Sequence, residues 1–199
     1  IELEGLPLIM HPARVFRDTF PDITLIVVLP GKYFAMWDEM VHRYRFRHPY
    51  ILAEGGETRF HSVKNGLEKL GDEEMVAVHD AVRPVISRDL VRRCFALTEK
   101  KGSAVPVILP VESLRQVKQQ GSQPVKREEF RIVQTPQVFI TRFLQEAYDT
   151  GYDPSFTDDA SVMEAAGYEV FLTEGERNNI KITYPEDLIL AAQLIKKRR

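Results

Sequence analysis

Residues 76–84 read Val-Ala-Val-His-Asp-Ala-Val-Arg-Pro, an apolar run followed at once by charged side chains and a proline. The run at 75–79 predicts a strand buried on both faces, because apolar residues follow one another without polar alternation. This strand delivers Asp80 and Arg83 into a turn that Pro84 closes. The stretch therefore predicts an α/β sheet with charged groups at its carboxyl edge, where such sheets bind their ligands.

Apolar runs and amphipathic stretches alternate along most of the chain. Residues 23–29, Ile-Thr-Leu-Ile-Val-Val-Leu, form another run typical of a buried strand. Further strands are predicted at 51–53, 103–109, 169–173 and 179–183, and helices at 7–20, 33–44, 62–70, 90–98, 141–149, 159–166 and 185–197. This alternation predicts one α/β domain over residues 1–199, with a mostly parallel sheet.

Residues 112–131 interrupt the alternation. The segment is polar, contains Gln-Gln-Gly-Ser-Gln at 119–123, and has strand-like residues at 114–117 and 131–133. Two short strands around a polar turn predict a projecting β-arm. A mobile loop is the alternative interpretation.

Composition restricts the classes of function. The net charge of −2 gives no general attraction to nucleic acid or to an anionic membrane, so we expect neither as a partner. No apolar run reaches the roughly 18 residues of a membrane span. The single cysteine, Cys94, cannot form an intrachain disulfide, which favours a cytoplasmic location. Any nucleotide binding must come from a local site.

Asp80 and Arg83 suit phosphate chemistry. A carboxylate at a strand end can bind Mg²⁺ against phosphate oxygens, and a neighbouring arginine can hold a phosphate through two parallel hydrogen bonds. The structural alternative is an Asp80–Arg83 pair that braces the turn. His79, at the strand end, is interpreted as a hydrogen-bonded structural residue rather than a catalyst.

Two further stretches suit a nucleotide pocket. Residues 55–67 begin with Gly-Gly-Glu-Thr-Arg, in which the glycines let the backbone approach a planar base closely. Ser62 in this stretch either bonds to the base or caps the following helix. Residues 134–139, Gln-Thr-Pro-Gln-Val-Phe, are interpreted as a polar turn between a strand and a helix that shapes the pocket.

Two more stretches suit the second substrate. In Phe-Thr-Asp-Asp-Ala-Ser, residues 156–161, the aspartates suit a helix cap, and Thr157 is placed to bind a phosphate. Lys181 lies in a predicted alternating strand and shares one face with Asn179 and Thr183. A lysine among apolar neighbours needs an anionic partner, and a substrate phosphate is the candidate.

In their order and spacing, these stretches resemble the family of 2-C-methyl-D-erythritol 4-phosphate cytidylyltransferases. The matching pieces are Gly-Gly-Glu-Thr-Arg, His-Asp-Ala-Val-Arg-Pro, Gln-Thr-Pro-Gln-Val-Phe, Thr-Asp-Asp-Ala-Ser and Asn-Ile-Lys-Ile-Thr-Tyr-Pro-Glu-Asp-Leu. The resemblance implies a Rossmann-like nucleotidyltransferase fold and transfer of CMP from CTP to methylerythritol phosphate, with pyrophosphate released and Mg²⁺ as cofactor. It also implies a homodimer built by exchange of the arm at 112–131.

The resemblance further implies three groups of site residues. The nucleotide group consists of Gly56, Glu57 and Ser62 around the cytosine, Ala81 beside the ribose, and Asp80, which also binds the metal. The group on the methylerythritol phosphate side consists of Arg83, Ser113, Thr135 and Thr157. The catalytic pair, which positions the substrate phosphate for attack, consists of Arg127 from the partner's arm and Lys181.

Two departures from the family pattern accompany the resemblance. The family begins with a strand and a glycine-rich loop followed by Pro-Lys-Gln, and we expect such a stretch upstream of Ile1. Asn178 stands where many relatives carry an aspartate that serves as a second metal ligand. The alternative functions are the sister activity, ribitol-5-phosphate cytidylyltransferase, and a nucleotide-binding dimer without catalytic activity.

Overall fold

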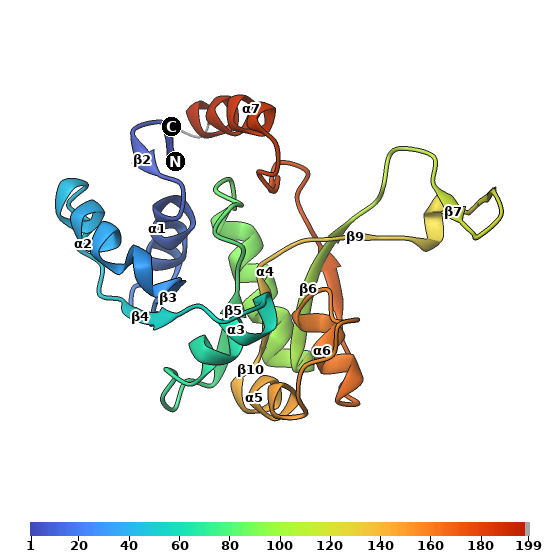
Figure 1. Cartoon of the computed structure of the whole chain (residues 1–199), viewed down its shortest axis with the longest axis horizontal. Helices are drawn as coiled ribbons and strands as arrows, with labels where there is room; N and C mark the ends of the chain where they lie inside the picture. Colours follow the sequence, from blue (N-terminus) through green and yellow to red (C-terminus); the bar gives the residue numbers. More distant parts are fainter. Residues whose placement is uncertain (198–199) are drawn as a thin grey trace.

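The computed structural model describes residues 1–197 and has a five-stranded sheet at its centre (Figure 1). Its strands are β5 (Met75–Val78), β6 (Ser103–Ile108), β9 (Ile132–Val133), β10 (Gln137–Ile140) and β11 (Leu172–Glu174). Their order is β11-β6-β10-β5, with β9 also paired to β6. Strand β11 is parallel to β6, but β10 runs antiparallel to both of its neighbours, and β9 is antiparallel to β6. The sheet is therefore mixed, and the prediction of a mostly parallel sheet is wrong.

Strand β10 is the reason for this difference. The sequence predicts a polar turn at 134–139, whereas Gln137, Val138 and Phe139 are each 0% exposed within the strand. Val138 pairs with Ala77 of β5 and with Ala104 of β6. A glutamine made this stretch look polar, but its amide is fully hydrogen-bonded inside the protein, so that it can occupy a central strand.

Helices cover both faces of the sheet. Helices α1 (Met10–Thr19) and α4 (Arg88–Lys101) pack on one face through Phe16, Leu90 and Cys94. Helices α3 (Arg59–Leu67), α5 (Thr141–Asp149) and α6 (Asp159–Ala165) bury the opposite face. Alternate residues of the central strands point to opposite layers, with Val138 in the first core and Phe139 in the second. Cys94 is fully buried in this core, and burial raises the pKa of its thiol to about 12.

A second, parallel pair of strands lies beside this sheet. Strand β3 (Ile26–Leu29) pairs with β4 (Ile51–Glu54), and helix α2 (Phe34–Arg43) packs on the pair with Trp37 fully buried. A largely apolar cavity of about 420 Å³ lies between β3 and β5. Its lining continues from the strands to Arg59, Ser62 and Asp80, so the cavity opens onto predicted site residues.

The two ends of the described chain lie close together. Strands β1 (Glu2–Leu3) and β2 (Leu6–Pro7) form a small antiparallel pair, and helix α7 (Pro185–Lys196) packs beside them (Figure 1). The predicted strand at 179–183 is wrong: this segment is extended and makes one backbone hydrogen bond to Val82 through Ile182. Within residues 1–197, no helix combines the length and apolar character that crossing a bilayer requires.

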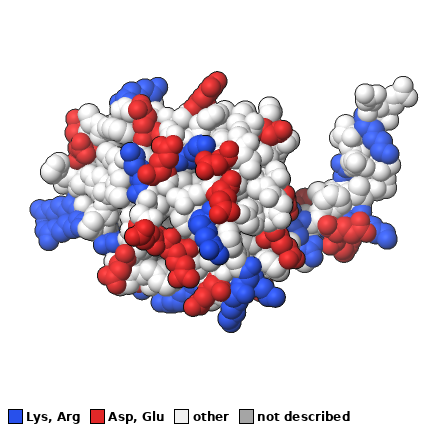
Figure 2. All heavy atoms as spheres, turned by 90° about the horizontal axis from the view of Figure 1, so that it is seen from below, with Lys and Arg blue, Asp and Glu red and all other residues white. Residues whose placement is uncertain are grey.

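The segment between β6 and β9 extends away from the rest of the chain (Figures 1 and 2). It contains the antiparallel hairpin β7 (Arg115–Val117) and β8 (Ser122–Pro124), followed by the short helix η2 (Arg127–Glu129). Large apolar side chains on this segment and at its base are exposed to solvent: Leu109, Val111, Val117, Phe130, Ile132 and Val133. On the face shown in Figure 2, basic and acidic side chains are interspersed rather than gathered in a basic stripe.

Candidate active site

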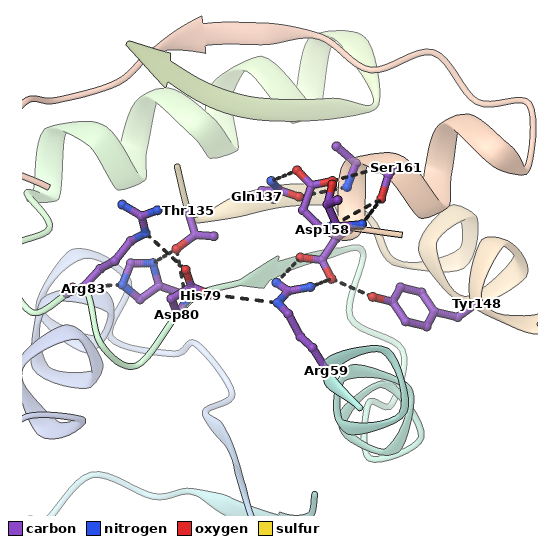
Figure 3. A network of polar contacts seen from close by, with 12 residues as sticks. Arg59, His79, Asp80, Arg83, Thr135, Gln137, Tyr148, Asp158 and Ser161 are labelled. Atoms are coloured by element: carbon purple, nitrogen blue, oxygen red, sulfur yellow. Dashed lines mark hydrogen bonds and ion pairs between the residues drawn. The ribbon is translucent and has the colours of Figure 1, made fainter. Parts of the chain in front are cut away.

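Asp80 lies just after β5, where three cationic side chains surround its carboxylate. Arg59 and Arg83 are shown beside it in Figure 3. The Nε of Arg83 lies 3.2 Å from Oδ2, and the Nζ of Lys181 lies 3.3 Å from the same oxygen. The Nε of Arg59 lies 3.9 Å from Oδ1. Burial acts to raise the pKa of Asp80, but the charges of Lys181, Arg59 and Arg83 outweigh it and lower the pKa below its ordinary value. The carboxylate is therefore ionised within a surplus of positive charge.

The backbone of Asp80 is held by Thr135, which in turn contacts His79. Its N–H donates to the hydroxyl oxygen of Thr135 at 3.0 Å, and this hydroxyl lies 3.1 Å from Nδ1 of His79. The other ring nitrogen of His79 lies 3.2 Å from the carbonyl oxygen of Arg83. Burial lowers the pKa of His79 to about 4, so the ring is neutral near pH 7. His79 thus has the structural role that the sequence predicted.

Arg83 connects Asp80 to the segment that carries Lys181. Besides its contact with Asp80, Arg83 donates from Nη1 to the carbonyl oxygen of Asn179 at 2.9 Å. The side-chain amide of Asn179, which is 0% exposed, donates to the carbonyl oxygen of Thr135 at 2.7 Å. These bonds place Lys181, two residues later, beside the end of β5 even though 179–183 is not a strand. The anionic partner predicted for Lys181 is Asp80 in this structure.

The glycine-rich turn after β4 approaches the same region. The N–H of Gly56 donates to Oγ of Ser62 at 3.0 Å, and Ser62 in turn donates to the carbonyl oxygen of Thr58. A Cβ atom on Gly56 would lie 2.3 Å from Cβ of His61, so the turn requires glycine here. The cap of helix α3 is Thr58 rather than Ser62, and the helix begins at Arg59, three residues earlier than predicted.

The start of helix α6 forms the opposite side of the site. Asp158 caps the helix, as the sequence predicts, and Ser161 completes a capping box with it. The buried amide of Gln137 donates to Asp158 Oδ2 at 2.8 Å and accepts from the N–H of Ala160 at 2.9 Å (Figure 3). Thr157, directly before the cap, is exposed and available to a ligand.

The structure brings most of the predicted site residues to one edge of the sheet but not all of them. Asp80, Arg83, Thr135 and Lys181 are linked directly, and Ser62, Asp80 and Ala81 line the same cavity. Ser113 and Arg127 lie on the projecting segment, where Arg127 donates to the carbonyl oxygen of Val111 at 2.6 Å. Within one chain the projecting segment that carries them lies away from β5, the strand that Asp80 follows (Figure 1).

Two residues of the polar network were missed by the sequence analysis. Arg59 stands in the glycine-rich stretch without an assigned role, and Asp159 was considered only as a helix cap. In the structure Arg59 binds Asp159 through two hydrogen bonds. Arg59 precedes the helix that the sequence predicts at 62–70, and its partner lies a hundred residues later in the sequence. One sequence alone does not reveal such a pairing.

Asp80 is also the residue suited to a metal ion. Mg²⁺ keeps several waters and binds through one or two carboxylates together with substrate phosphates. Within residues 1–197, no group of three His, Cys, Asp or Glu side chains is arranged to hold a metal. One ionised carboxylate fits a Mg²⁺ ion that a nucleotide triphosphate brings with it, and does not fit a metal held by protein alone. Asn178 is exposed in the turn before Asn179.

A mixed α/β sheet with a carboxylate and three cations gathered beyond the end of β5 suits the binding of a phosphorylated ligand. The family model described as "IspD: 2-C-methyl-D-erythritol 4-phosphate cytidylyltransferase" matches residues 1–197. The chain belongs to this family.

Individual relatives agree with this assignment. The chain is 44% identical over 191 residues to the 2-C-methyl-D-erythritol 4-phosphate cytidylyltransferase of Bacteroides thetaiotaomicron, covering 96% of this chain and 87% of that protein. It is 43% identical over 195 residues to the enzyme of the same name from Porphyromonas gingivalis, covering 97% and 86%. The crystal structure of the Thermus thermophilus enzyme superposes with a TM-score of 0.80 at 35% identity, covering 98% of this chain and 92% of that one.

Proposed function

We propose that this enzyme transfers CMP from CTP to 2-C-methyl-D-erythritol 4-phosphate. The products are 4-diphosphocytidyl-2-C-methyl-D-erythritol and pyrophosphate, in the biosynthesis of isoprenoid precursors. Membership of the family supports this reaction. The observation that carries it is the group of Lys181, Arg83 and Arg59 around Asp80. Two anionic reactants must meet in this reaction, and a surplus of fixed positive charge is what lowers the cost of their meeting.

The reaction is a direct displacement at phosphorus. A phosphate oxygen of the substrate forms a bond to the α-phosphorus of CTP, and the bond from that phosphorus to the bridging oxygen of pyrophosphate breaks. No covalent intermediate with the protein is required. The protein contributes positioning and charge neutralisation. Lys181 is suited to hold the attacking phosphate, because its side chain is 51% exposed while Asp80 fixes its direction.

The nucleotide is assigned to the region between the glycine-rich turn and Asp80. Gly56, Glu57 and Ser62 are proposed to surround the cytosine, and Ala81 to adjoin the ribose. The close approach of Gly56 to helix α3 and the cavity lining shared by Ser62 and Ala81 support this placement. Asp80 would hold Mg²⁺, which when bound neutralises charge on the phosphates of CTP.

The second substrate is assigned to the opposite side. Thr157 is exposed at the start of α6 and is suited to contact the substrate directly. Arg83 is 8% exposed and Thr135 is 5% exposed, and both already bind Asp80. We therefore assign to these two residues the orientation of Asp80 in addition to substrate contact.

Ser113 and Arg127 are assigned to the site of a partner chain. Both lie on the arm at 112–131, away from Asp80 of their own chain, so they can reach a site only by exchange of the arm in a homodimer. The exposed apolar residues of the arm, which include Val117 at 81% and Phe130 at 44%, support burial against a second copy. Arg127 would then position the substrate phosphate together with Lys181 of the other chain.

The test is pyrophosphate release from CTP, with Mg²⁺ present, in the presence of methylerythritol phosphate or ribitol 5-phosphate. Release with methylerythritol phosphate alone is expected. Release with ribitol 5-phosphate instead would assign the enzyme to the sister activity. Release with neither, from protein that binds CTP, would contradict catalysis and leave a nucleotide-binding dimer.

A further inference from the structure

Arg59 joins two parts of the active site that lie far apart in the sequence (Figure 3). Its Nη1 donates to Asp159 Oδ1 at 2.9 Å, and its Nη2 donates to Oδ2 at 2.6 Å. An arginine that binds a carboxylate through two nitrogens has a fixed guanidinium plane. The remaining nitrogen, Nε, therefore faces the Asp80 carboxylate at 3.9 Å in a defined direction.

Asp159 is a rigid anchor for this arginine. Its side chain is 0% exposed, and the hydroxyl of Tyr148 donates to Oδ1 at 2.6 Å. Tyr148 is itself 1% exposed and stacks on Phe60, the residue after Arg59, with ring centroids 4.5 Å apart. Burial acts to lower the pKa of Arg59, but the bonds and charge of Asp159 outweigh it and raise the pKa. Arg59 therefore keeps its charge, and Asp159 is bound by both Arg59 and Tyr148.

The anchor also determines where the substrate side of the site lies. Asp159 is the first residue of helix α6, directly after the cap Asp158 and two residues after Thr157. Gln137 fastens this helix start to the sheet through its bonds to Asp158 and Ala160. Arg59 is the contact that links the same helix start to the nucleotide side, because its other neighbour is Asp80.

We propose that the Arg59–Asp159 pair is a positioning device for cytidylyl transfer, which holds Asp80 and the Thr157 segment at a fixed separation. Neither residue needs to touch a reacting atom. Errors of about 1 Å between the reactants are enough to cost two orders of magnitude in rate. The inference rests on the proposed roles of Asp80 and Thr157.

A purely structural role for the pair makes a different prediction, which a double variant can separate. Arg59→Met leaves the buried carboxylate of Asp159 without its cation, which destabilises the protein. Adding Asp159→Asn removes that charge. The double variant should therefore be more stable than Arg59→Met and should unfold at the same urea midpoint as Asp159→Asn alone. If positioning is the role, the kcat of this stable double variant remains about 10- to 100-fold below the wild type.

The conservative variant Arg59→Lys provides the matching rescue. It keeps a cation near Asp80 but cannot bind Asp159 through two nitrogens. We expect a kcat between those of the wild type and the double variant. Arg92→Met is the control, because Arg92 on helix α4 pairs with the exposed Asp89 at 3.4 Å; its kcat should stay within about twofold of the wild type.

The measurements are the urea midpoint, kcat, and KM for CTP and for methylerythritol phosphate. A double variant with a restored midpoint and wild-type kcat and KM values would overturn the inference and leave a structural pair. If the double variant does not reach the urea midpoint of Asp159→Asn, the test uses Arg59→Lys instead. A wild-type kcat for Arg59→Lys would then overturn the inference. Absence of turnover in the wild type would instead contradict the proposed function.

Discussion

The ammonium nitrogen of Lys181 lies 3.3 Å from a carboxylate oxygen of Asp80. The two residues lie 101 positions apart in the sequence. Arg83 connects them by binding Asp80 and the carbonyl oxygen of Asn179. The lysine is half exposed and the aspartate is largely buried. A substrate phosphate can therefore approach the lysine from solvent while the aspartate keeps the ammonium in place.

Replacing Lys181 by methionine should lower kcat by about 10²–10³-fold, the usual cost of one group that stabilises transition-state charge. The urea midpoint should change little, because a half-exposed ion pair contributes about 0–1 kcal/mol. Pyrophosphate release and urea unfolding measure the two effects. Lys196→Met is the matched control, since Lys196 pairs with Glu4 at 3.3 Å on helix α7. Equal loss of activity in both variants would contradict a specific role for Lys181.

Acidification should destabilise the fold through His79. Burial lowers the pKa of its ring to about 4 from an ordinary value of 6.5. Between these values the unfolded chain binds a proton that the folded chain does not, so the free energy of unfolding falls as the pH is lowered. This loss is roughly 3 kcal/mol over the whole window. Urea unfolding at several pH values measures it.

The variant His79→Gln is the control for this window. Glutamine can donate and accept hydrogen bonds but does not titrate, so the dependence between pH 6.5 and about 4 should flatten. Asp80 contributes to acid sensitivity only at lower pH. Because its pKa is lowered in the folded protein, its contribution to the free energy of unfolding is fully present above pH 3.8 and is lost as the pH falls further. An unchanged slope in His79→Gln would assign the acid sensitivity to other groups.

Gly56→Ala should disturb the nucleotide side of the site. The added Cβ would lie 2.3 Å from Cβ and 2.9 Å from the carbonyl carbon of His61, so the turn must move. We expect a loss of about 1–3 kcal/mol in stability and a higher KM for CTP. At Gly71 the nearest atom to an added Cβ is a side-chain oxygen of Glu73 at 3.4 Å. Gly71→Ala should therefore be close to neutral, and a similar KM increase in both variants would contradict the assignment.

Exchange of the arm predicts that two inactive variants restore activity when mixed. Arg127→Ala damages only the arm that a chain donates, and Lys181→Ala damages only the body that receives it. A mixed dimer then contains one intact site, so unfolding and refolding an equal mixture should give about a quarter of the wild-type activity. Each variant refolded alone is the control. No recovery from a mixture shown to contain mixed dimers would contradict sharing of the site.

Sequence patterns predicted helices well where a helical periodicity or an N-cap residue marks the element clearly. Helix α5 has the predicted bounds 141–149, and α6 begins at 159 because Asp158 and Ser161 form a capping box. The patterns failed where a polar residue is satisfied by distant partners. Gln137 made strand β10 look like a turn, although its amide binds Asp158 and the backbone of helix α6.

By itself, the sequence determined the chemical character of the site: a carboxylate and an arginine after an apolar strand, a lysine requiring an anion, and a glycine turn. These follow from residue type and local spacing, which act over a few residues. The prediction that this apolar strand is buried on both faces is wrong, because all four residues of β5 are partly exposed. Tertiary structure alone decided that β10 runs antiparallel between β5 and β6, and that Arg59 binds Asp159 beside Asp80. The direction of β10 and the Arg59–Asp159 pair both depend on contacts between segments that are distant in the sequence. These contacts contribute energy only when packing removes the contacting groups from water.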